Sequence, residues 1–116
     1  MTRVFVYGTL KRGGENHEWI KSQTFVASAR TKPLYRMFDL GGYPGMICAE
    51  NGIAIEGEVW DVDEACLARL DVLEDIDGDE YERVLIELEG EFAAQRVEGY
   101  LYLRDLSGRR DAGACW

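Results

Sequence analysis

The chain has 116 residues, 47% of them hydrophobic and 30% charged, which is enough for one hydrophobic core and one domain. A formal net charge of −9 repels a phosphate backbone, so we expect no nucleic-acid partner. No apolar run approaches the roughly 20 residues that span a bilayer, and no signal peptide precedes the first strand. We therefore expect a cytoplasmic protein without a membrane partner.

Cysteine and histidine usage argues against a metal centre. The three cysteines are odd in number and never form a C-x-x-C pair, so neither a disulfide framework nor a zinc site is indicated. The single histidine, His17, rules out a multi-histidine metal site. We expect His17 to be a solvated surface residue, the alternative being a catalytic one.

The first half of the chain is typical of short strands separated by glycine and proline turns. A strand over residues 3–7 leads into a glycine-rich loop, which is followed by a brief helical turn around 15–21. The further strands expected in this half cover residues 24–30, 33–39 and 46–49, with a turn at 40–45.

The second half predicts one helix between strands. Residues 53–62 alternate as a strand, and a helix with Asp61 or Asp63 as its cap follows and ends near Asp75. Two more strands, at 81–89 and 96–103, are close enough to form a hairpin. For the polar tail, both an ordered segment and a loose end fit the sequence.

These elements do not alternate regularly between strand and helix, which disfavours a doubly wound parallel sheet. The pattern instead indicates an α+β domain over residues 1–104, in which six or seven strands form a closed or strongly curved mixed sheet beside one main helix. Residues 105–116 form a polar C-terminal tail outside that domain.

The stretch VFVYGTLKRGG, residues 4–14, begins as a buried strand and breaks into a loop. Gly8 and Gly13 have the spacing of a phosphate-binding loop, but Gly14 and Glu15 stand where that motif needs Lys and Ser or Thr. A nucleotide site is therefore not indicated. A strand that ends at a glycine can still expose consecutive main-chain N–H groups, which bind a carboxylate or an oxyanion.

The other interpretation of this loop is purely structural. Gly8 then only permits a tight turn, while Tyr7 and Leu10 pack in the core. Lys11 and Arg12 are expected to face solvent or to lie at the rim of a site.

Glu74 falls on the apolar face of the predicted helix, where a carboxylate needs an explanation. Burial, the helix C-terminus and the acidic residues that follow should all raise its pKa, which makes Glu74 a candidate general base or acid. In the alternative, the helix frays and the carboxylate turns into water, or Arg83 pairs with it.

Four segments in this order resemble the gamma-glutamylcyclotransferase-like family, which includes gamma-glutamylamine cyclotransferases and the related enzyme of butirosin biosynthesis. They are VFVYGTL, GEVWDV, LDVLED and YERVLIEL, and the resemblance spans residues 3–103. It implies a small mixed β-barrel with flanking helices. It also implies a cofactor-free reaction that cyclises a gamma-glutamyl amine or amide to 5-oxoproline and releases the free amine.

The same resemblance implies roles for individual residues. Glu74 matches the catalytic glutamate. Asp75 departs from the family, in which a glycine often follows that glutamate. The residues that match the substrate-binding positions, or that accompany them, are Tyr7, Gly8, Thr9, Leu10, Tyr81 and Arg83.

Two further functions fit the sequence. The first is a non-catalytic module that keeps the pocket and binds a gamma-glutamyl group or another small carboxylate. The second is an acidic interaction protein that docks through the run from Glu74 to Glu80. The amine attached to a gamma-glutamyl substrate and the oligomeric state have no signal in the sequence.

Overall fold

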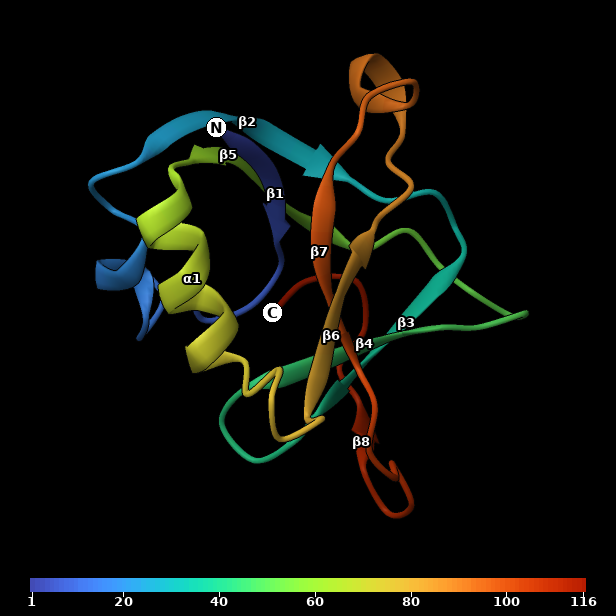
Figure 1. The fold of residues 1–116 in the computed structure, drawn as a ribbon. Coiled ribbons are helices and arrows are strands. Elements are labelled where there is room, and N and C mark those ends of the chain that lie inside the picture. The colour runs from blue at the N-terminus through green and yellow to red at the C-terminus, as the bar shows by residue number, and fades with distance from the viewer.

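A computed structural model describes residues 1–116 as eight strands in two sheets with one α-helix (Figure 1). The helix is α1 (Glu64–Leu73), and single 3-10 turns cover His17–Trp19 and Gly90–Phe92. No helix is long and apolar enough to cross a membrane. The strands are β1 (Thr2–Val6), β2 (Thr24–Arg30), β3 (Tyr35–Asp39), β4 (Pro44–Cys48), β5 (Glu56–Val62), β6 (Tyr81–Leu85), β7 (Glu98–Tyr102) and β8 (Arg110–Asp111).

The larger sheet has the order β2-β5-β1-β7-β6, so β1 is its central strand. β1 runs antiparallel to β5, with Val6 opposite Glu58, and parallel to β7. β6 and β7 form the predicted antiparallel pair. Because β1 is flanked on both sides, the loop that follows it leaves from the middle of the sheet.

The smaller sheet has the order β4-β3-β8. Its last strand, β8, comes from the polar tail, and Arg110 of β8 pairs with Asp39 of β3. The sequence had left open whether this tail is ordered. The Glu56 N–H also donates to the Ala114 carbonyl at 2.7 Å, so the tail is held at two places.

The mixed α+β class with one main helix is confirmed. The strands number eight, compared with the six or seven expected, because the tail adds a two-residue strand. No ladder of strand pairs joins the two sheets, so the structure has two separately hydrogen-bonded sheets where the prediction was one barrel.

β1 supplies the core on both of its faces, because successive side chains of a strand point to opposite sides. Val4 and Val6 belong to the cluster that contains Leu70 of α1. Phe5 packs on the other side, with Met37 of the smaller sheet. The larger sheet therefore lies between α1 and the smaller sheet, as Figure 1 shows.

Hydrogen bonds fix both ends of α1. Asp63 is the N-cap, and its carboxylate accepts from the Cys66 N–H at 2.7 Å. At the other end the Asp75 N–H donates to the Val72 carbonyl and the Ile76 N–H to the Asp71 carbonyl, the bond pair of a Schellman motif. This motif ends the helix at Leu73, two residues before the predicted end.

The Schellman motif also explains why a glycine suits the position after Glu74. Asp75 has a φ of +52°, in the left-handed region that favours glycine. Aspartate tolerates this conformation better than most residues, because its short polar side chain can bond locally. Asp75, which stands where the family often has a glycine, therefore adds modest backbone strain.

We predict that Asp75→Gly is more stable than Asp75→Ala by about 1 kcal/mol, because alanine keeps the Cβ that crowds a left-handed residue. Urea denaturation of the two variants measures this difference. Equal free energies of unfolding would contradict the strain at this position.

Candidate active site

A pocket lies where β1 ends and α1 stops, and its empty space is about 370 Å³ with the open solvent at its mouth included. It joins segments that are distant in the sequence: the end of β1 with its loop, the turn before β4, the end of α1, and strands β6 and β7. Its lining residues are Phe5, Val6, Tyr7, Gly8, Thr9, Leu10, Tyr43, Pro44, Glu74, Tyr81 and Tyr100.

The loop after β1 presents main-chain donors at the pocket wall. The N–H groups of Gly8, Thr9 and Leu10 donate to no other group of the chain. Residue 8 has no room for a side chain, because a Cβ there would lie 2.5 Å from Pro44 Cγ. Tyr7 is buried in the core, as the structural interpretation expected, so the loop both packs and leaves three N–H groups available.

Glu74 lies opposite this loop as the C-cap residue of α1. Its side chain is half-buried, and its carboxyl group makes no hydrogen bond or ion pair. Burial raises the pKa of Glu74 to about 7, and the negative charge of Glu80 adds to the effect. Arg83 does not neutralise Glu74, because its guanidinium contacts Asp71 at 2.9 Å and Glu98 at 2.7 Å.

Tyrosine hydroxyls hold the walls of the pocket. Tyr7 donates to the Tyr100 carbonyl at 2.8 Å and accepts from the Met46 N–H at 3.1 Å. Tyr81 donates to the Pro44 carbonyl at 2.7 Å. Burial raises the pKa of Tyr7 and of Tyr81, so both stay protonated at neutral pH. Each has already donated its only hydrogen, and neither has a proton to give a ligand.

The remaining ionisable lining residues are Tyr43, whose hydroxyl donates to Glu80 at 2.8 Å, and Tyr100, whose hydroxyl donates to Asp71 at 2.8 Å. Glu74 is thus the one ionisable group in the pocket lining whose polar atoms have no partner. An unpaired carboxyl with a pKa near neutrality, in one pocket with residues whose N–H groups are free, can exchange a proton with a ligand that those N–H groups hold.

Comparison with known proteins identifies the family. Residues 4–116 match the family described as "Gamma-glutamyl cyclotransferase, AIG2-like". The chain belongs to this family. The resemblance seen in the sequence is therefore confirmed.

Relatives carry names from the same family. A Vibrio cholerae protein provisionally named a gamma-glutamylcyclotransferase is 46% identical over 84 residues, which cover 72% of this chain and 70% of that protein. The gamma-L-glutamyl-butirosin B gamma-glutamyl cyclotransferase of Niallia circulans is 38% identical over 79 residues, 67% of this chain and 49% of that protein. An AIG2-like protein from Mus musculus has a similar fold, with a TM-score of 0.70, 28% identity, and coverage of 90% of this chain and 77% of that one.

For this gamma-glutamylcyclotransferase family member, most residues proposed from the sequence meet at one place. Glu74 lines the pocket, and Arg83 does not, because Asp71 and Glu98 hold its side chain between α1 and β7. The proposed residues that line the pocket beside Glu74 are Tyr7, Gly8, Thr9, Leu10 and Tyr81.

The sequence missed five lining residues: Phe5 and Val6 at the end of β1, and Tyr43, Pro44 and Tyr100. Tyr43 and Pro44 belong to the turn LGGYPG, in which aromatic and proline residues beside glycines are the only signal. Tyr100 is one of the inward-pointing residues of β7, and the alternation pattern does not distinguish it from an ordinary core residue.

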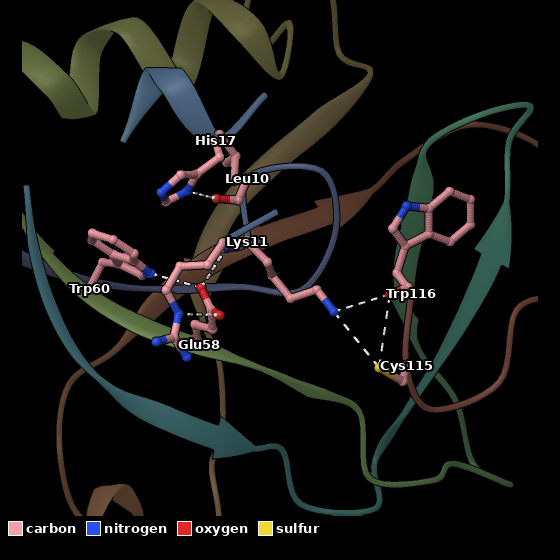
Figure 2. A network of polar contacts seen from close by, with 8 residues as sticks. Leu10, Lys11, His17, Glu58, Trp60, Cys115 and Trp116 are labelled. Carbon is pink, nitrogen blue, oxygen red and sulfur yellow. Dashed lines mark hydrogen bonds and ion pairs between the residues drawn. The ribbon is translucent and has the colours of Figure 1, made fainter. Parts of the chain in front are cut away.

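The expectation that His17 is a solvated surface residue is wrong. His17 is half-buried, its Nδ1 lies 3.0 Å from the Leu10 carbonyl oxygen, and its ring packs edge-on against Trp60 at 5.4 Å. Arg12 is exposed, as expected, and its N–H and guanidinium donate to Glu58, which joins the loop to β5. Figure 2 shows Glu58 and Trp60 of β5 beside Leu10 and Lys11 of the loop.

We predict that Glu74→Gln gains stability relative to the native protein as the pH rises from 5 to 8. The carboxyl has a pKa of about 7 when folded and an ordinary value of 4.5. The stability of the native protein therefore falls as the pH rises from 4.5 to about 7, because in this range Glu74 ionises in the unfolded chain only. The relative gain should be roughly 2 kcal/mol in urea denaturation.

The exposed Glu82→Gln is the matched control, for which no such pH dependence is expected. A stability difference between Glu74→Gln and the native protein that does not change with pH would contradict the raised pKa.

Proposed function

We propose that this protein is a gamma-glutamyl cyclotransferase that converts a gamma-glutamyl amine or amide to 5-oxoproline and the free amine. The observation that carries the proposal is the unpaired Glu74 carboxyl, with a pKa of about 7, in one pocket with the free N–H groups of the loop after β1. The names of the relatives support the same activity.

The reaction requires the α-amine of the substrate to attack its own γ-carbonyl carbon. An α-ammonium group has no lone pair, so a base must first remove a proton. With an amine pKa of about 8, transfer to an ordinary glutamate is uphill by roughly 5 kcal/mol. At the raised pKa of Glu74 the same transfer is uphill by only ~1.4 kcal/mol, which makes Glu74 an effective base.

The proton that Glu74 takes up is then available for the leaving group. The new bond joins the α-nitrogen to the γ-carbon, and the bond from that carbon to the amine nitrogen breaks. Glu74 donates this proton to the departing nitrogen. The carboxylate then takes the second proton, which the ring nitrogen must lose, and passes it to the released amine, so one residue serves as base and as acid and returns to its initial state.

The loop after β1 supplies fixed dipoles for the same substrate. The N–H groups of Gly8, Thr9 and Leu10 have no acceptor in the protein, so a bound anion gains hydrogen bonds without breaking any. They can hold either the α-carboxylate of the substrate or the oxyanion of the tetrahedral intermediate. Positioning on either atom favours the folded chain that closes a five-membered ring.

We predict release of 5-oxoproline from at least one member of a panel of gamma-glutamyl amines and gamma-glutamyl amino acids, measured by chromatography. Glu74→Gln should lower kcat by about 10²–10⁴-fold, because an amide cannot carry the proton. The control Glu82→Gln should keep the native rate, since Glu82 is exposed and outside the pocket lining.

Full activity of Glu74→Gln would exclude it as the acid–base group. No turnover across the panel, together with a ligand-induced rise in melting temperature, would instead support the non-catalytic binding module.

We further predict that kcat/KM falls below a pH of about 7, where Glu74 becomes protonated. Glu80→Gln should move this limb of the profile to lower pH, since it removes a negative charge that raises the pKa of Glu74 while the amide oxygen can still accept from Tyr43. Asp77→Asn is the control for a neighbouring charge, and its profile should not move. A limb that stays in place in Glu80→Gln would contradict this role for its charge.

A further inference from the structure

A buried carboxylate lies directly behind the loop that carries the free N–H groups. Glu58 of β5 is only 7% exposed and stands opposite Val6, the last residue of β1. It does not line the pocket. The proposed chemistry gives it no task, so its burial requires a separate explanation.

Glu58 uses both of its oxygens to hold Arg12. Oε1 accepts from the Arg12 N–H at 3.1 Å, and Oε2 accepts from the Arg12 Nε at 3.0 Å (Figure 2). Oε1 also accepts from the Trp60 indole N–H at 3.1 Å. Burial by itself raises the pKa of Glu58, but the hydrogen bonds from Arg12 and Trp60 outweigh it and bring the pKa below its ordinary value.

The Arg12 side chain is fixed on its other side by an aromatic ring. Its guanidinium carbon lies 3.9 Å from the centroid of the Phe25 ring, and that ring packs edge-on against Trp60. A cation between a carboxylate and an aromatic face has little freedom to move. Arg12, two positions after Leu10, is therefore bound to the larger sheet through both its main-chain N–H and its side chain.

Four further contacts hold the loop at the residues that bear the N–H groups. The Gly8 carbonyl accepts from the Lys11 N–H at 3.1 Å, and the Thr9 carbonyl accepts from the Asn16 N–H at 2.9 Å. The Leu10 carbonyl lies 3.0 Å from His17 Nδ1, and Thr9 Oγ1 accepts from Asn16 Nδ2 at 2.9 Å. These contacts use the carbonyl and hydroxyl oxygens of Gly8, Thr9 and Leu10 and leave the N–H groups of the same residues free. The bonds from Glu58 complete the support from the opposite side.

We propose that Glu58 is a positioning residue, which fixes the direction of the Gly8, Thr9 and Leu10 N–H groups by holding Arg12. The proposal rests on the proposed function, since those N–H groups matter for catalysis only if they bind a gamma-glutamyl substrate. A misplacement of about 1 Å in a positioning contact can lower a rate by about 10²-fold.

The chain offers a matched control on the same strand. Asp61 of β5 forms an ion pair with Arg3 of β1 at 2.8 Å, close to the 3.0 Å of the pair between Glu58 and Arg12. Asp61 contacts neither the loop nor the pocket. Asp61→Asn therefore removes a comparable interaction between Arg and carboxylate without touching the proposed positioning.

The experiment compares Glu58→Gln with Asp61→Asn. The amide of Glu58→Gln can keep one oxygen for the Arg12 N–H but turns a donor toward its guanidinium. We expect kcat/KM to fall about 10- to 100-fold in Glu58→Gln and less than about twofold in Asp61→Asn. Arg12→Ala, a change at an exposed side chain, should reproduce the loss even if Glu58→Gln folds poorly.

The double variant that combines Arg12→Ala with Glu58→Gln should be no less active than the less active of these two single variants, because both changes break the same contact. Equal losses in Glu58→Gln and Asp61→Asn, or additive losses in the double variant, would overturn the proposal.

Hydrogen exchange of the loop amides gives a readout that does not depend on activity. Glu58→Gln should speed exchange at the hydrogen-bonded loop amides of Lys11 and Arg12 relative to α1, and Asp61→Asn should not. If the native protein releases no 5-oxoproline from any substrate, the proposed function fails. The exchange data then still decide whether Glu58 orders the loop, and unchanged loop exchange would overturn that role.

Discussion

Burial of the Glu74 carboxyl without a counter-ion is the constraint on which the rest of the site depends. The Schellman motif stops α1 at Leu73, and Glu74, the C-cap residue of this helix, lines one pocket with the end of β1. Arg83, the partner that the sequence offered for this carboxyl, is occupied by Asp71 and Glu98. The pKa of the carboxyl therefore stays near neutrality, whereas a salt bridge would lower it.

The two sheets meet around this carboxyl through contacts that need small residues and buried hydroxyls. Gly8 touches Pro44, and a Cβ on Gly45 would lie 2.9 Å from the Tyr102 side chain. The hydroxyl of Tyr7 bonds to β7 and β4 at once, so it joins both sheets at the pocket wall. These contacts join the segments that bring the Glu74 carboxyl and the loop after β1 into one pocket.

Alternation and helical spacing were sufficient to predict most strands and the helix, because these depend on local patterns, and they left the cap open between Asp61 and Asp63, of which the structure shows Asp63. The sequence could not predict β8, since two polar residues have no periodicity and pair only because β3 lies beside them. It also misplaced His17, whose environment is made by Trp60 of β5. Such side chains acquire their partners from segments far along the chain.

The sequence by itself determined the α+β class, the glycine loop after a buried strand and an acidic residue on an apolar helix face. Each of these is encoded within a few neighbouring residues. Only the tertiary structure decided that Glu74 faces that loop without a partner, that Arg83 turns elsewhere and that Arg12 is held by Glu58. The physical reason is that burial and charge pairing depend on which segments meet in space, and local patterns do not specify those distances.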